Sequence, residues 1–135
     1  MAQLIDTSVF IQLERRGLSV EMAIGSAIDE SYALAAITAA ELLYGVERAN
    51  TPERLARRTT FVEAMLSAVP VIPFDLPVAR EHARLWARLD AAGRRIGPYD
   101  LLVAATALAI GYDVLTFNVG EFERVPGLTV LRPNW

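Results

Sequence analysis

The sequence predicts a three-layer α/β sandwich, in which helices flank a central, mainly parallel sheet. Short apolar segments alternate with longer segments in which apolar residues recur every three or four positions. Strands that alternate with helices favour a parallel sheet, because each strand-to-strand crossover then carries a helix. The sequence shows no repeat, linker or low-complexity tract, so we expect one domain over residues 1–135.

The first half of the chain is expected to supply two strands and four helices. Residues 2–5 form an apolar run typical of a buried strand, and residues 7–15 continue at helical spacing. Thr7 or Ser8 can cap that first helix. A helix over 20–30, a strand over 32–37 and a helix over 38–48 follow. Pro52 then suits the first turn of a helix over 52–68.

The second half is expected to complete the sheet with three more strands. Residues 69–74 are predicted as a strand, and residues 77–92 as an arginine-striped amphipathic helix that ends at Gly93. An alanine-rich helix over 98–110 is closed by Gly111, a residue common just beyond helix ends. A strand over 114–117, a short turn or helix, and a last strand near 128–131 end the chain.

Composition excludes several classes of site. The chain has no cysteine, which rules out disulfides and thiolate zinc sites. All 13 basic residues are arginine, so no lysine can serve a phosphate-binding loop or a Schiff base. His82 is the only histidine, which excludes histidine-rich metal sites. The net charge of -3 argues against a basic, nucleic-acid-coating protein, so phosphate chemistry would need bound cations.

The chain shows no sign of membrane insertion or export. No apolar run reaches the roughly 20 residues that a membrane-spanning helix needs. The first residues lack the basic start and long apolar stretch of a signal peptide. We therefore expect a cytoplasmic protein with no membrane partner.

Four acidic residues are predicted to meet at one edge of the sheet. Asp6 directly follows the first strand, and Glu121 follows the strand over 114–117. Glu41 and Asp100 fall in the first turns of their predicted helices. Ligands of open parallel sheets bind at the carboxyl ends of the strands, which is where these side chains are expected.

Each acid also has a structural explanation, and that of Asp6 is that it caps the helix that follows it. Thr38 and Glu41 have the spacing of a capping box, and Asn118 with Glu121 forms another plausible capping pair. Asp100 suits the positive end of its helix dipole. However, four such acids at one edge would repel one another and raise their pKa values unless a divalent cation lay among them. This arrangement favours metal-assisted hydrolysis of a phosphate ester.

Four segments, in this order and spacing, resemble the PIN-domain family, and within it the VapC-type toxins of type II toxin–antitoxin systems. They are residues 4–8 (LIDTS), 39–45 (AAELLYG), 97–105 (GPYDLLVAA) and 115–122 (LTFNVGEF). The resemblance implies a Mg²⁺- or Mn²⁺-dependent endoribonuclease that hydrolyses RNA phosphodiester bonds. It also implies a homodimer that a cognate VapB-like antitoxin holds inactive.

The resemblance also implies roles for individual residues. Asp6 and Asp100 would be the principal metal ligands, Glu41 would hold the metal or its water, and Glu121 would be the fourth acid. The supporting polar residues it implies are Thr7, Ser8, Thr116 and Asn118.

This chain departs from the family pattern in the last motif. Many relatives carry an aspartate where this chain has Asn118 and then Glu121, and Phe117 stands where relatives often have arginine. The departure motivates an alternative function, a PIN-fold RNA- or protein-binding module with little nuclease activity. A flavodoxin-like receiver or phosphatase is disfavoured, because the required lysine and second aspartate are missing.

The arginines have two expected roles. Arg94 and Arg95 precede the helix over 98–110 and are predicted contacts for the RNA backbone or for an antitoxin acid. A stripe on the helix over 77–92 is interpreted as a solvated face, paired in part with Glu81. It consists of Arg80, Arg84 and Arg88.

The remaining aromatic and apolar candidates are expected in packed positions. His82 is predicted to lie in the core or at a dimer contact rather than to act in catalysis. The same core or interface role, rather than base stacking, is expected for Leu43, Tyr44, Phe61 and Met65.

Overall fold

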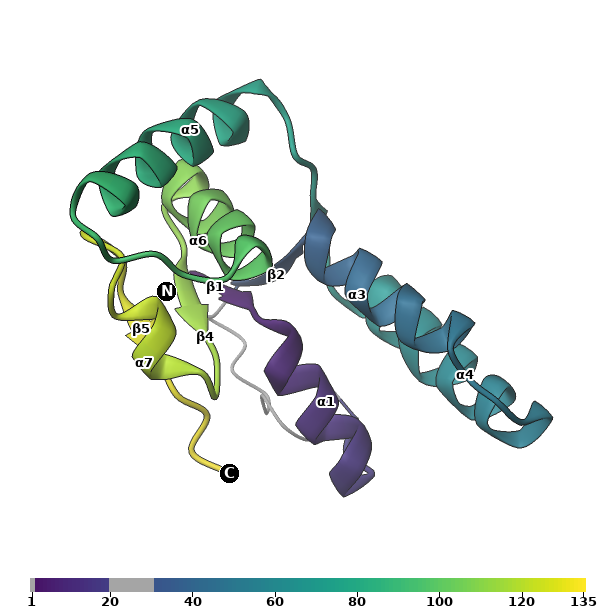
Figure 1. The fold of residues 1–135 in the computed structure, drawn as a ribbon. Coiled ribbons are helices and arrows are strands. Elements are labelled where there is room, and N and C mark those ends of the chain that lie inside the picture. Colours follow the sequence, from purple (N-terminus) through teal and green to yellow (C-terminus); the bar gives the residue numbers. More distant parts are fainter. Residues whose placement is uncertain (1, 20–30) are drawn as a thin grey trace.

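The computed structural model describes residues 2–19 and 31–135, and in this part of the chain five strands form one sheet (Figure 1). The strands are β1 (Ala2–Ile5), β2 (Ser31–Ala35), β3 (Val71–Ile72), β4 (Asp113–Leu115) and β5 (Val130–Leu131). Their order in the sheet is β3-β2-β1-β4-β5, and each of these pairings is parallel. The predicted parallel sheet is confirmed.

Six helices cover the sheet in the described residues. They are α1 (Thr7–Arg16), α3 (Ala36–Glu47), α4 (Pro52–Ala68), α5 (Leu76–Ala91), α6 (Pro98–Ile110) and the short α7 (Val119–Phe122). The predicted helix over residues 20–30 lies outside the described residues. No described helix has the length and apolar character that crossing a membrane requires.

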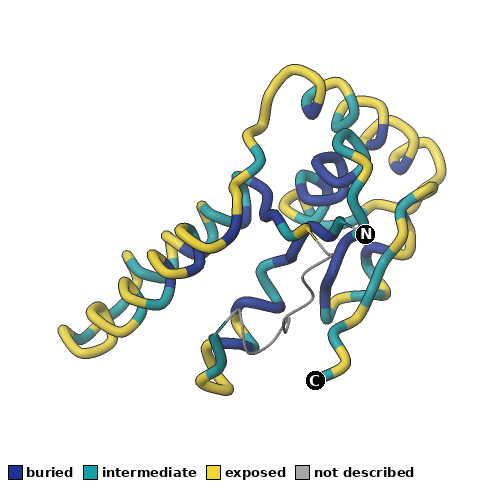
Figure 2. The backbone as a smooth tube through the Cα atoms, turned by 180° about the vertical axis from the view of Figure 1, so that it is seen from behind, coloured by how far each residue is buried: buried dark blue, intermediate teal, exposed yellow. Residues whose placement is uncertain are grey.

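Two hydrophobic cores lie on opposite faces of the sheet, which gives the predicted three layers. Successive strand residues point to opposite faces, so Leu4 and Val114 pack with α5, α6 and α7. Their neighbours Ile5 and Leu115 pack with α1, α3 and α4. Figure 2 shows the result, with buried strands at the centre and exposed residues on the outer turns of the helices.

Most predicted bounds differ from the structure by one or two residues, and two of these differences have a clear physical reason. The strand expected over 69–74 is reduced to Val71–Ile72, because Pro70 and Pro73 flank it and lack the N–H groups that a longer ladder needs. The helix expected over 38–48 begins at Ala36, directly after β2. Thr38 is therefore a buried residue inside this helix rather than its N-cap.

The strand ends place polar residues at one edge of the sheet. Asp6 directly follows β1, and its backbone N–H donates to the Leu115 carbonyl at 2.9 Å. Thr116 directly follows β4, and its N–H donates to the Leu131 carbonyl at 2.9 Å. The backbone of this edge is thus hydrogen-bonded beyond the last paired residues, which holds the two side chains beside each other.

Candidate active site

Asp6 is the most buried acid at the sheet edge. It is only 5% exposed, and one carboxylate oxygen, Oδ2, accepts hydrogen bonds from Ser8 Oγ and Thr116 Oγ1, both at 2.8 Å. Asp6 is the N-cap residue of α1, but its side chain makes no capping hydrogen bond. Neither Thr7 nor Ser8 caps that helix, so this prediction was wrong. The carboxylate is therefore directed by hydroxyl groups rather than by the helix end.

The same two hydroxyl groups also bind the chain that follows β4. Ser8 Oγ accepts a hydrogen bond from the Phe117 N–H at 3.1 Å, and Thr116 Oγ1 accepts one from the Asn118 N–H at 2.9 Å. The start of α1, the end of β4 and the Asp6 carboxylate thus form one hydrogen-bonded network. Its effect is to hold the Asp6 side chain in a defined orientation.

Glu41 approaches the edge from α3. Its Oε1 accepts a hydrogen bond from Thr7 Oγ1 at 2.7 Å. Burial raises the pKa of the Glu41 carboxyl, the bond from Thr7 opposes that rise, and the negative charge of Asp6 adds to it. Glu41 therefore lies close enough to Asp6 for the two charges to repel each other.

The predicted capping box at Glu41 was wrong. Because α3 begins at Ala36, with Ala35 as its N-cap, Glu41 lies in the second helical turn and not in the first. Thr38 is fully buried, and its hydroxyl finds no hydrogen-bond partner among the described residues. The Glu41 carboxylate is thus turned toward Thr7 instead of the helix terminus.

Asp100 is the acid whose pKa is raised by burial and by the charges of the other three acids. It lies in the first turn of α6, as predicted. Burial, and then the charges of Asp6, Glu121 and Glu41 in that order, together raise the pKa of Asp100 from 3.8 to about 7. Asn118 Nδ2 donates to Asp100 Oδ2 at a long 3.4 Å. The structure thus brings all four predicted acids into one electrostatic cluster.

Glu121 joins this cluster through a backbone contact that the sequence did not predict. Its Oε1 accepts a hydrogen bond of 2.6 Å from the Gly97 N–H, so it ties α7 to the segment before α6. The predicted capping pair with Asn118 was wrong, since the Asn118 side chain makes no capping bond. The signal in the sequence is Pro98, which disfavours a helical conformation at Gly97 and so leaves the Gly97 N–H outside the helix.

Comparison with known proteins identifies the family. The PIN domain model matches residues 4–128 of the chain. The chain belongs to the PIN domain family. This PIN domain is 37% identical to Ribonuclease VapC1 of Rickettsia felis over 131 residues, which are 97% of this chain and 96% of that relative. It is 36% identical to the tRNA(fMet)-specific endonuclease VapC of Salmonella typhimurium over 97 residues, 72% of this chain and 71% of the relative.

The fold of this PIN domain also resembles that of solved VapBC proteins. It matches the crystal structure of VapBC2 from Rickettsia felis, bound to a DNA fragment from their promoter, with a TM-score of 0.85 and 25% sequence identity. The match covers 98% of each chain. The predicted resemblance to VapC-type proteins is confirmed.

The donor chemistry of this PIN domain fits a hard divalent cation. Its clustered ligand groups are carboxylate oxygens, the donors that Mg²⁺ and Mn²⁺ prefer. Burial and then the neighbouring negative charges raise the pKa of Asp100, and a bound cation would offset those charges. However, within residues 2–19 and 31–135 no three acidic or histidine side chains are spaced as a ready-made ion site. The acids thus form a loose cluster rather than a preformed cage.

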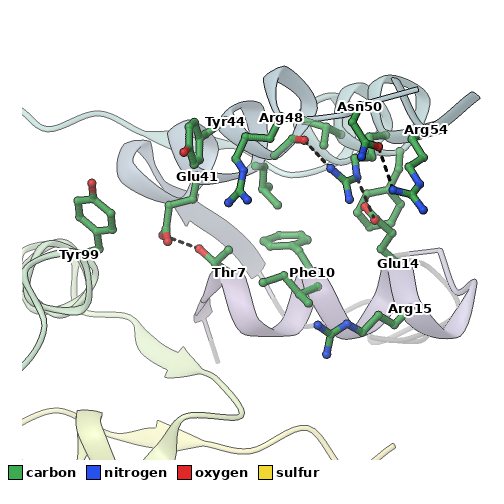
Figure 3. Close-up of a pocket in the computed structure, with 16 residues that line it drawn as sticks. Thr7, Phe10, Glu14, Arg15, Glu41, Tyr44, Arg48, Asn50, Arg54 and Tyr99 are labelled. Atoms are coloured by element: carbon green, nitrogen blue, oxygen red, sulfur yellow. Dashed lines mark hydrogen bonds and ion pairs between the residues drawn. The ribbon is translucent and has the colours of Figure 1, made fainter. Parts of the chain in front are cut away.

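A cavity of about 870 Å³ opens beside Glu41, between α1, α3 and α4. Figure 3 shows Thr7, Glu41 and Tyr99 at one end, and Glu14, Asn50 and Arg54 at the other. Its apolar lining includes Phe10, Ile11, Phe61 and Val62. Four arginines also line it, namely Arg15, Arg48, Arg54 and Arg58. The cavity therefore runs from the acidic cluster toward positive charge.

The arginines favoured by the sequence lie elsewhere. Neither Arg94 nor Arg95 lines this cavity, and Arg95 Nε pairs with Asp90 Oδ1 at 2.9 Å. On α5, the predicted pair between Arg84 and Glu81 is confirmed, with a nitrogen–oxygen distance of 2.7 Å. The sequence thus missed the arginines that line the cavity, although Arg54 and Arg58 share one helical face by their spacing.

The packed positions expected for aromatic and apolar residues are confirmed only in part. Met65 is buried in the core, and Phe61 packs against it. Leu43 and Tyr44 are 41% and 62% exposed, so a core position for them was wrong. His82 lies half-buried between the rings of Phe74 and Trp86, with centroid distances of 5.7 and 5.6 Å.

Proposed function

We propose that this PIN domain is a Mg²⁺- or Mn²⁺-dependent endoribonuclease, the toxin of a VapBC-like toxin–antitoxin pair. The observation that carries the proposal is the gathering of Asp6, Glu41, Asp100 and Glu121 at one edge of the sheet, where burial and then the neighbouring charges raise the pKa of Asp100. In a family whose relatives are ribonucleases, such a cluster of carboxylates suits the hydrolysis of RNA phosphodiester bonds.

In this proposal Asp6 and Asp100 are the principal ligands of the metal ion, and Glu41 and Glu121 hold the ion or its water. A bound ion would lower the pKa of a water molecule and offset negative charge on the scissile phosphate. The chain's own contribution is orientation, since each acid has a polar partner in the structure. The hydroxyl and amide partners are Ser8 and Thr116 on Asp6, Thr7 on Glu41, and Asn118 on Asp100.

The proposed partners follow from the relatives. The Rickettsia felis structure is that of VapBC2 bound to a promoter fragment. We propose that this chain likewise binds a VapB-like antitoxin and forms a homodimer. Arg94 and Arg95 remain the predicted contacts to RNA or to the antitoxin. Both are exposed, and the Arg95 side chain is 82% exposed despite its ion pair with Asp90.

The test is metal-stimulated cleavage of transfer RNA and of a mixed-sequence single-stranded RNA by purified protein. Asp6→Asn and Asp100→Asn are expected to lower the cleavage rate at least about 100-fold, a loss of about 2.7 kcal/mol in transition-state stabilisation. Glu63→Gln, an exposed acid on α4 that lies outside the cluster and the cavity lining, is the matched control and should cleave normally. A chelator must abolish the wild-type activity, which excludes a metal-independent contaminant. Unchanged cleavage in both site variants would refute the assignment.

One observation favours the alternative, a binding module with little nuclease activity. The acids of the described residues do not form a ready-made ion site, and Glu121 is already bonded to the Gly97 N–H. Calorimetric titration with Mn²⁺ separates the two functions. Binding that is lost in Asp100→Asn supports the nuclease, whereas no binding at millimolar Mn²⁺ supports the module.

A further inference from the structure

We propose that Tyr44 and Tyr99 are a base-stacking site beside the acidic cluster, and that Arg48 and Arg54 hold the phosphates of the same strand. The substrate would then be single-stranded RNA that lies along the cavity between α1, α3 and α4. This inference rests on the proposed nuclease function and assigns the substrate-binding surface of that site.

The two tyrosine rings are largely exposed to solvent, so apolar surface of each ring is free to contact a ligand. Tyr44 is 62% and Tyr99 54% exposed, although both line the cavity that Glu41 enters. Tyr44 lies one turn after Glu41 on α3, and Tyr99 directly precedes Asp100 on α6 (Figure 3). Two aromatic rings from different helices thus lie near Glu41, one of the four acids of the cluster. Unpaired bases stack on such rings, whereas paired bases in a duplex cannot.

Arg48 and Arg54 extend this site with positive charge that pairs with no acid among the described residues. Arg48 Cζ lies over the Tyr44 ring, 5.5 Å from its centroid, so the guanidinium covers one face of the ring and a base would stack on the other. Arg54 Nη1 bonds only the neutral Asn50 side chain, at 2.9 Å, in the described part of the chain. Arg58 differs, because Glu14 at 3.9 Å and the Gly45 carbonyl at 2.9 Å engage it.

Charge order favours RNA over an acidic peptide as the occupant. A polyanion can place one phosphate among the carboxylates only with a cation there, and its next phosphates then lie toward Arg48 and Arg54. An acidic peptide could bind the arginines and the apolar lining, but it carries no bases to stack on the two rings near Glu41. A nucleotide strand accounts for the rings and the charges together.

The experiment measures binding separately from cleavage. A labelled single-stranded oligoribonucleotide is titrated by fluorescence anisotropy in the Asp100→Asn background, which is expected to bind without cutting. Adding Tyr44→Ala or Tyr99→Ala should weaken binding about tenfold each, the loss typical of one stacked base. Tyr44→Phe and Tyr99→Phe keep the ring and should bind normally. Arg48→Gln and Arg54→Gln should each lower the slope of log affinity against log salt by about 0.7.

Controls isolate stacking from charge and from surface area. Trp86→Ala and Arg88→Gln, both exposed on α5, should leave RNA binding unchanged. An abasic oligomer of the same length should keep the arginine effects and lose the tyrosine effects. The inference is overturned if the alanine variants bind RNA normally or weaken the abasic oligomer equally. It is also overturned if polyglutamate binds as tightly and responds to the same variants, because the surface is then a site for acidic peptides.

Failure of this inference is distinguishable from failure of the nuclease function. Wild-type protein that cleaves RNA while the tyrosine variants bind normally would refute only the stacking site. Wild-type protein that never cleaves, but whose inactive variant binds RNA through Tyr44 and Tyr99, would refute only the nuclease.

Discussion

At the scale of the residue, the site consists of acids that are individually restrained and collectively crowded. Thr7 holds Glu41, and Ser8 with Thr116 holds Asp6, so these carboxylates cannot easily turn away from Asp100. Burial and the resulting repulsion explain the pKa of about 7 at Asp100. The energetic cost of that repulsion is expected to be visible in the stability of the metal-free protein.

Asp100→Asn should make the metal-free protein more stable, with a defined pH dependence. The Asp100 pKa rises from 3.8 in the unfolded chain to about 7 in the fold, so between those values only the folded state holds this proton. Wild-type stability therefore falls as pH rises from about 4 to about 7. The melting temperature of Asp100→Asn minus that of wild type should grow over this range and stay level above it.

Thermal unfolding in the presence of a chelator, at pH values from about 4 to 8.5, measures this difference. Asp90→Asn serves as the control, since it removes an exposed carboxylate outside the cluster. A difference that is the same at every pH, or that shrinks toward pH 7, would contradict the placement of Asp100 among like charges.

The sequence could predict which acids gather but not how each is held. The order of strands and helices was enough to bring Asp6, Glu41 and Asp100 to one edge, since parallel strands end together. The partner of Glu121 is the Gly97 N–H, which depends on how α7 packs near α6. The spacing of Asn118 and Glu121 suggested a capping pair instead, because local spacing does not show which residues meet in the folded protein.

At the scale of the element, helix ends were predictable where backbone chemistry marks them. α4 and α6 have their predicted bounds, since proline begins each helix and Gly111, with φ 74°, ends α6. The start of α3 was not predictable, because β2 passes into the helix without a loop and no side chain caps it. Side-chain caps elsewhere in the fold can therefore be changed without altering the acidic cluster.

Asp75→Ala should destabilise the protein while leaving RNA cleavage unchanged. Asp75 is the N-cap of α5, and its Oδ1 accepts from the Val78 N–H at 3.1 Å. Loss of such a cap costs about 1 kcal/mol, a decrease of about 3–5 °C in melting temperature for a domain of this size. Asp75→Asn retains a capping oxygen and should melt close to wild type. Equal losses in both variants would show that charge, not capping, is what Asp75 supplies.

At the scale of the whole molecule, one sheet serves two cores. Each central strand sends alternate residues to opposite faces, as Leu4 and Ile5 do from β1. Neither helical layer can therefore keep its core when the sheet is lost. Trp135 adds a link at the end of the described chain, because its ring lies 5.5 Å from that of Phe117 and 5.1 Å from Arg16 of α1. We propose on these grounds that residues 1–135 fold as one domain.

This proposal predicts one cooperative unfolding transition. The two tryptophans report different layers, since Trp86 lies on α5 and Trp135 contacts α1 and the turn after β4. Urea titrations of Trp86→Phe and Trp135→Phe, followed by fluorescence, should agree in midpoint with far-ultraviolet circular dichroism of the same variants. Mn²⁺ should raise both midpoints together, because an ion that binds only the native state stabilises every part that unfolds with it. Separate midpoints, or a shift in one layer alone, would instead divide the chain into two folding units.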